Sequence, residues 1–192
     1  VEGQPALHEG RARHRHWANE FAGTDYTFAM PVVYPWAWNW SWYDADNAAW
    51  RWFHSGLRVA SNAGRHTPED IPIIPFVHWH TVDVAPHVPG APTPEDMAPI
   101  EQMSEATYAD LLWHMLLRGC DTFFLWCSTH ENEKEVALLH RTWAEAQEYG
   151  RFLDNGRPIN FDLPGTPGPV VSGLVLGDEV LVRRTDFTDS RA

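Results

Sequence analysis

A row of aromatic side chains is the part of the sequence best suited to bind a ligand. In the segment YPWAWNWSWYD, Trp stands at every second position: Trp36, Trp38, Trp40 and Trp42. Alternate side chains of an extended chain lie on one face, so these indoles would form one flat apolar surface. Such a surface can cover the C–H face of a sugar ring, and it can equally fill a gap between a loop and the protein body. Both interpretations stay open.

A histidine pair forms a second group. His78 and His80 make an H-x-H pattern, which places both imidazoles on one face of an extended segment. His130 or Glu131 would complete a ligand set for a metal ion. A His near a sugar site more often donates a hydrogen bond, and eleven His residues in the chain make chance pairs common. We therefore expect no metal and no cofactor, and keep His78 and His80 as candidate substrate-binding residues.

Carboxylates provide the third group. Glu131 and Glu133 follow an apolar run, and one of them is suited to act as a general acid or base. The alternative is that both complement the positive N-terminal end of the next helix. Asp44 ends the aromatic row. Our candidate catalytic residues are therefore Glu131 and Asp44, in an unconventional arrangement.

Three apolar runs predict the strands that would position these groups, at residues 27–34, 71–77 and 122–126. Pro72 and Pro75 limit the hydrogen bonding of the second run. A helical pattern follows each run, so we expect a parallel sheet with right-handed crossovers. Ligands bind at the carboxyl ends of such strands, which is where the aromatic row, the histidine pair and the acidic pair fall.

The helices are predicted from apolar residues spaced three and four apart. The first has Asp44 and Asp46 as N-cap candidates and ends at Gly64, and the second begins at Ser104. The third covers residues 132–153 and is closed by Asn155-Gly156. The residues expected to face the core are Ala49, Trp52, Phe53, Gly56, Ala60, Tyr108, Leu111, Leu112, Met115, Leu116, Val136, Leu139, Trp143 and Ala146.

Beyond Pro158 the pattern changes. Two alternating runs flank Gly177-Asp178, which predicts a β-hairpin. With 192 residues the chain is shorter than the roughly 250 of a complete eight-stranded α/β barrel. The expected fold class is α/β, a partial (half) TIM-type β/α barrel with parallel strands. Its divisions are an irregular or helical leader (1–26), the β/α half-barrel (27–157) and a C-terminal β-hairpin or start of a small β-domain (158–192).

Charge and cysteine content narrow the partners. Because 26 acidic residues face 14 basic ones, giving a formal charge of -12, we expect neither nucleic acid nor membrane as a partner. No run approaches the about 18 apolar residues of a membrane span, and no signal-peptide pattern opens the chain, so secretion and a cytoplasmic location both fit. Cys120 and Cys127 lie too far apart for a disulfide with each other if the run between them is extended, and we expect reduced, buried thiols.

The segment SEATYADLLWHMLLRGCDTFFLW, residues 104–126, resembles the end of a hyaluronidase-family barrel, where a Ser-initiated helix leads through Gly into a strand ending in Trp. Upstream, PVVYPW, LRVAS and IPIIPFVH are similar to that family's Tyr-bearing strand, Arg-Val-containing helix and Pro-started strand. The resemblance covers residues 27–133 and implies that Tyr34 and Trp126 line the subsite around the scissile bond. The family's Asp-x-Glu pair finds no match before Thr27, and His78 stands where the family has Arg.

The leading hypothesis is a glycoside hydrolase-like protein that hydrolyses or binds a poly- or oligosaccharide. The substrate-binding candidates are Tyr34, Trp36, Trp38, Trp40, His78, His80 and Trp126. The alternatives are a non-catalytic carbohydrate-binding protein and a metal-dependent hydrolase using His78, His80 and His130. The net charge suits a neutral glycan better than a polyanion. Because an open half-barrel exposes its sheet edges, we expect a homodimer or an N-terminal half of the same polypeptide to complete it.

Overall fold

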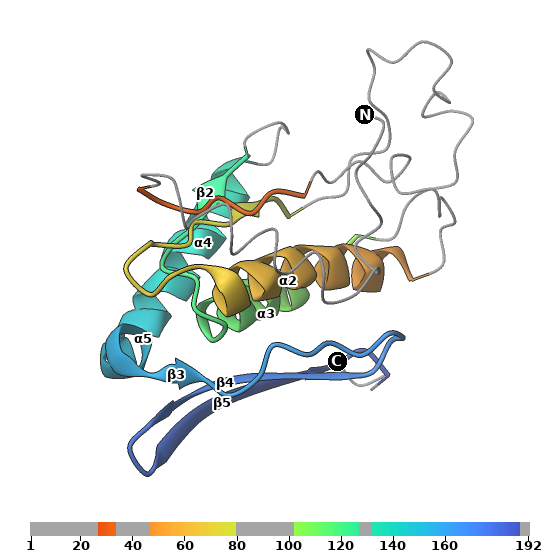
Figure 1. The fold of residues 1–192 in the computed structure, drawn as a ribbon. Coiled ribbons are helices and arrows are strands. Elements are labelled where there is room, and N and C mark those ends of the chain that lie inside the picture. The colour runs from red at the N-terminus through yellow and green to blue at the C-terminus, as the bar shows by residue number, and fades with distance from the viewer. Residues whose placement is uncertain (1–26, 34–46, 80–101, 127–131, 189–192) are drawn as a thin grey trace, which may run out of the picture.

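The computed structural model describes residues 27–33, 47–79, 102–126 and 132–188. Their elements, in chain order, are α2 (Ala48–His66), β1 (Phe76–Val77), α3 (Glu105–Leu116), β2 (Phe124–Leu125), α4 (Asn132–Gln147), α5 (Gly150–Asn155), β3 (Arg157–Pro158), β4 (Pro169–Leu176) and β5 (Glu179–Asp186). Helices α2 and α3 lie between the parallel pair β1–β2 and the antiparallel sheet β3–β4–β5 (Figure 1). The protein is thus a mixed α/β fold, and the described residues form no closed barrel.

Three extended segments run parallel in chain order, as the sequence predicts. Ala29 forms a parallel bridge with Ile73, and β1 pairs with β2 in parallel, Phe76 opposite Phe124. The two prolines fit because this pairing uses their carbonyls: Pro72 accepts from the Ala29 N–H at 2.8 Å and Pro75 from the Phe124 N–H at 2.9 Å. Regular strand geometry covers only two residues in each of β1 and β2.

Most of the predicted core is confirmed. Trp52, Phe53, Ala60, Tyr108, Leu111, Leu112, Met115, Leu116, Leu139 and Ala146 are all buried. On α4 the predicted face is wrong in part, because Val136 is 36% exposed. Positions 135, 138 and 142 are buried together with the predicted 139 and 146, so the buried face is shifted from the expected one and places Glu135 inside.

Helix α2 differs from the prediction at both ends. Asn47 holds the N-cap position with φ 58°, whereas the predicted candidates Asp44 and Asp46 lie outside the described residues. Gly64 does not end the helix, which continues to His66. The glycine is needed for packing instead, because a Cβ there would lie 2.0 Å from the carbonyl oxygen of Arg118.

Replacing Gly64 by Ala should therefore destabilise the fold by about 1–3 kcal/mol, although Ala has the better helix propensity by about 1 kcal/mol. The added methyl meets backbone, which cannot rotate away. Gly150→Ala is the matched control, because a Cβ there meets nothing within 4 Å. Urea unfolding of both variants measures the difference, and equal free energies of unfolding would contradict this account of the close contact.

The single helix predicted over 132–153 is interrupted. α4 ends at Gln147 and α5 begins at Gly150, with a turn between them in which the Tyr149 N–H donates to the Ala146 carbonyl at 2.9 Å. Gly150 is a poor helix former, which favours a break at this point. The predicted stop is confirmed, because α5 ends at Asn155 and Gly156 is its C-cap.

The predicted hairpin is confirmed around Gly177-Asp178. β4 and β5 are antiparallel with Leu176 opposite Glu179, and Gly177 supplies φ 63° in the two-residue turn. β3 adds a short third strand beside β4. Among the described residues, none of the helices combines the length and apolarity that crossing a bilayer requires.

Candidate functional site

Two of the predicted site residues, His78 and Trp126, fall within the described part of the chain. The catalytic candidates Glu131 and Asp44 and the substrate-binding candidates Tyr34, Trp36, Trp38, Trp40 and His80 lie outside it, as do His130 and Cys127. The site is therefore built from His78, Trp126 and the residues that surround them.

His78 and Trp126 meet at the carboxyl ends of β1 and β2. His78 directly follows Val77, and Trp126 directly follows Leu125. The backbone N–H of Trp126 donates to the Val77 carbonyl at 3.0 Å, which extends the strand pairing to this position. The imidazole lies edge-on to the indole, with ring centroids 5.4 Å apart and planes at 70°. The structure thus brings together two strand-end residues that are 48 positions apart.

Glu135 completes the cluster and was missed by the sequence analysis. Its side chain is 1% exposed, and its Oε2 lies 3.5 Å from His78 Nδ1. Its Oε1 accepts hydrogen bonds from the Trp79 backbone N–H and from the Tyr108 hydroxyl, both at 2.7 Å. Burial, together with the charge and the hydrogen bond of Glu135, holds the pKa of Tyr108 well above its usual value, so this hydroxyl stays a donor.

A signal for Glu135 was present in the sequence. It lies three residues before Leu138 and four before Leu139, in register with the buried stripe of α4. A carboxylate inside an apolar stripe indicates a paired, buried group, because an unpaired buried charge is strongly unfavourable. The prediction placed Val136 on the buried face of the helix, and this orientation leaves Glu135 outside the core.

The cluster differs from an ordinary buried salt bridge because it is incompletely hydrogen-bonded. His78 Nδ1, His78 Nε2 and Glu135 Oε2 are all buried, and the structure gives none of them a hydrogen-bond partner within the described residues. Most buried polar side-chain atoms in proteins have such a partner or an ordered water. An Nδ1–H directed at Oε2 would leave Nε2 as an acceptor for a ligand hydroxyl or a water.

The backbone around His78 is held by three helices. The Trp52 indole N–H of α2 donates to the His78 carbonyl at 3.0 Å. The Trp79 ring stacks on Tyr108 of α3 with centroids 5.8 Å apart and planes at 7°, while α4 supplies Glu135. The imidazole is therefore fixed from outside the strand, as a preorganised site requires.

An aromatic surface adjoins the cluster on the strand face opposite the packed core. Phe76 stacks on Phe124 at 5.6 Å and 14°, and lies 5.8 Å from Trp126. Phe124 is 47% exposed and Phe28 is 45% exposed. This face therefore offers flat apolar area that leads to Trp126.

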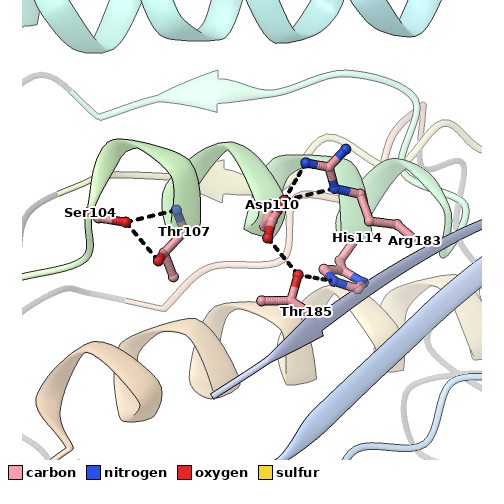
Figure 2. Close-up of polar contacts among 6 residues, drawn as sticks. All are labelled: Ser104, Thr107, Asp110, His114, Arg183 and Thr185. Carbon is pink, nitrogen blue, oxygen red and sulfur yellow. Dashed lines mark hydrogen bonds and ion pairs between the residues drawn. The ribbon is translucent and has the colours of Figure 1, made fainter. Parts of the chain in front are cut away.

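A second buried polar cluster links α3 to β4 and β5. Thr185 Oγ1 donates to Asp110 Oδ2 at 2.6 Å, so it accepts from the His114 Nε2–H at 3.0 Å. Nδ1 of the neutral imidazole is then an acceptor for the Ser172 hydroxyl at 2.7 Å, and Ser172 Oγ accepts in turn from Arg118 Nε at 2.7 Å. Figure 2 shows the Thr185, His114 and Asp110 part of this chain, with Arg183 bonded to Asp110.

The second cluster is structural. The side chains of Ser172, His114 and Arg118 are fully buried, and every one of them has a partner. The cluster contains a serine, a histidine and an aspartate, but each of these side chains already has a hydrogen-bond partner, and Thr185 separates His114 from Asp110. Figure 2 also shows the confirmed N-cap of α3, where Ser104 Oγ accepts from the Thr107 N–H at 3.1 Å.

The described residues contain no group of three or more His, Cys, Asp or Glu that could hold a metal ion. His80 and His130 of the metal hypothesis lie outside them. Cys120 is free and buried, as expected, and burial raises the pKa of its thiol far above the neutral range.

The chain matches no protein-family model, no curated protein and no solved structure.

Proposed function

We propose that the chain forms part of a glycoside hydrolase-like site for a neutral poly- or oligosaccharide. One observation carries the proposal: a buried, incompletely hydrogen-bonded His78–Glu135 pair lies against Trp126 at the carboxyl ends of parallel strands. An indole supplies the flat apolar face that a pyranose ring covers. The imidazole supplies the polar atom that a sugar hydroxyl requires.

The residues have separate roles in this proposal. Trp126, which is partly exposed, is the contact surface. His78 Nε2 is buried beside it and binds a water that links the imidazole to a sugar hydroxyl, or a hydroxyl that displaces this water. Glu135 is a positioning residue, because its Oε1 is engaged by Trp79 and Tyr108 and its Oε2 faces His78. Acid and base chemistry is assigned to Glu131 and Asp44, as the sequence hypothesis has it.

We further propose that the three parallel segments belong to a β/α barrel. Their order follows the chain, and α2 and α3 cover one face. The opposite face carries Phe28, Phe76 and Phe124, which would be interior in a closed barrel. Parallel sheets are normally buried on both faces, so completion by a second copy or by an N-terminal half is the simplest explanation. Native mass spectrometry of the purified chain distinguishes these two routes.

Replacing Trp126 by Ala should weaken oligosaccharide binding at least about tenfold, on the order of 1.4 kcal/mol, because the apolar ring face is lost. Trp143→Ala is the matched control, since Trp143 is partly buried on α4 and lines a pocket to which Trp126 does not contribute. Calorimetry with cellotetraose, xylotetraose, maltotetraose and chitotetraose identifies the ligand and gives both affinities. Equal losses in the two variants would rule out Trp126 as the sugar-binding surface.

Turnover separates an enzyme from a binding protein. Chromatography of the bound tetrasaccharide after long incubation should reveal shorter products, and Glu131→Gln should abolish them while binding is retained. Binding without any product in the wild-type protein would favour the non-catalytic alternative. Turnover that survives Glu131→Gln would remove that residue from the mechanism.

A further inference from the structure

A cavity with a polar lining lies between α2 and the segment that leads into β4. Its volume is about 390 Å³, and Arg51, His54, Ser55 and Arg58 of α2 line it opposite Thr166. This volume lies in the range of small-molecule pockets in proteins, roughly 300–1,000 Å³. The cavity is therefore large enough for a small ligand.

The basic lining comes from the helical register. Positions 51, 54, 55 and 58 are spaced three and four apart, so their side chains share one face of α2. The buried face of the same helix carries Phe53 and Leu57. No Asp or Glu occurs among the described residues that line the cavity, in a chain with 26 acidic and 14 basic residues. Basic side chains are thus locally concentrated against the overall charge.

We propose that this cavity binds a tetrahedral oxyanion, the phosphate or sulfate group of a small molecule. Arg51 and Arg58 lie two helical turns apart, about 10 Å along the axis, and long side chains from these positions can converge on one anion. Guanidinium groups bind phosphate and sulfate oxygens through paired N–H donors. The hydroxyls of Ser55 and Thr166 are further donors on opposite walls.

The overall negative charge does not oppose such binding. At physiological ionic strength charges farther away than about 8 Å are largely screened, so the net charge of the whole chain does not determine the potential inside the cavity. Both arginines have contacts within the protein as well. A guanidinium has five N–H donors and can bind more than one partner at a time.

His54 reports on the same environment. Burial and then the charge of Arg58 lower the pKa of His54, while its hydrogen bond to the Pro164 backbone acts in the opposite direction. A bound dianion would change the surroundings of this imidazole directly.

The cavity is separate from the candidate glycan site, which α2 contacts through Trp52. The proposal does not depend on the glycan function.

The test is a titration with inorganic phosphate, and in parallel with inorganic sulfate, at ionic strength held constant with sodium chloride. The His54 imidazole resonances should shift to saturation with at least one of these anions, and comparing the two arms tells which ester group the cavity prefers. The double variant Arg51→Gln, Arg58→Gln should weaken that binding at least tenfold. Arg157→Gln removes one charge at an exposed position of β3 and should leave the affinity within twofold.

Two results would overturn the proposal. One is the absence of saturable binding with both anions, and the other is a double variant whose affinity stays within twofold of wild type. If the double variant fails to fold, as judged by its circular dichroism, the single variant Arg58→Gln decides in its place. It should bind the anion at least threefold more weakly than Arg157→Gln does, and equal affinities would contradict the assignment.

Discussion

Replacing Arg118 by Met is expected to destabilise the protein by about 3–5 kcal/mol, because it leaves several buried hydrogen-bond acceptors unsatisfied, at about 1–3 kcal/mol each. The Arg118 side chain is 0% exposed. Its guanidinium donates to Ser172 Oγ at 2.7 Å, to Ser61 Oγ at 2.9 Å, and to the carbonyls of Asp162 and Val171, both at 3.1 Å. Methionine fills part of the volume but leaves these acceptors without a donor. Burial lowers the Arg118 pKa only to about 10, so the group is charged at neutral pH.

The test is urea unfolding of Arg118→Met beside three other variants: Arg157→Met, Ser172→Ala and the double variant Arg118→Met, Ser172→Ala. Arg157→Met changes an exposed arginine and should alter the free energy of unfolding by less than about 0.5 kcal/mol. The pair Arg118→Met, Ser172→Ala should cost less than the sum of its single changes, because the second change removes an acceptor left unsatisfied by the first. A loss for Arg118→Met as small as that for Arg157→Met would show that the network contributes little.

The second large effect is acid sensitivity caused by His114. Burial, and then the charges of Arg118 and Arg183, lower the His114 pKa to about 3, against 6.5 for an ordinary imidazole. The folded state therefore keeps His114 neutral where the unfolded state binds a proton. Its contribution to stability is complete above pH 6.5 and is lost as the pH falls from 6.5 toward 3, by about 1.4 kcal/mol per pH unit.

Replacing His114 by Gln isolates this contribution. As the pH falls from 6.5 to 4, the free energy of unfolding should decrease more steeply for wild type than for the variant. Toward pH 4 the difference in slope should approach about 1.4 kcal/mol per pH unit, which corresponds to the uptake of one proton. Other groups that titrate here, His54 among them, occur in both proteins and cancel in the comparison. Parallel pH profiles would mean that His114 takes up its proton in the folded state, contrary to the buried hydrogen-bond chain.

The two buried polar clusters differ in how completely they are hydrogen-bonded. Around Arg118 and His114 each buried side chain has a hydrogen-bond partner, and the cluster fastens the antiparallel sheet to α3. Around His78 and Glu135 three buried atoms have no such partner within the described residues. The first arrangement is typical of a structural network. The second is typical of a site at which a ligand or a water is still required.

Elements with local signals could be predicted from the sequence. Ser104 caps α3 through its own hydroxyl, Gly156 follows the last helix, and Gly177-Asp178 closes the hairpin. Each depends on residues within a few positions, where side-chain chemistry determines the backbone directly. The parallel order of the strands followed from the alternation of apolar runs and helical patterns.

Features that depend on distant partners were not accessible in the same way. Gly64 looked like a helix stop because glycine commonly follows the last helical residue, whereas the neighbour that requires it, the Arg118 carbonyl, comes from the turn after α3. The buried role of Glu135 depends on Tyr108 and Trp79, which lie 27 and 56 positions away. Arg118 itself sits in an apolar segment, yet its acceptors are separated from it by up to 57 positions. Only the folded chain brings these groups together.

The most direct test of the glycan site is to follow the His78 imidazole by NMR while the protein is titrated with the four tetrasaccharides. Comparison with a His78→Asn variant assigns its resonances among those of the eleven histidines. We predict that one tetrasaccharide shifts the His78 signals to saturation, with the affinity found by calorimetry, and that Trp126→Ala raises the concentration needed at least about tenfold. Binding by calorimetry that leaves the His78 signals unmoved, or no binding of any tetrasaccharide, would contradict the proposed site.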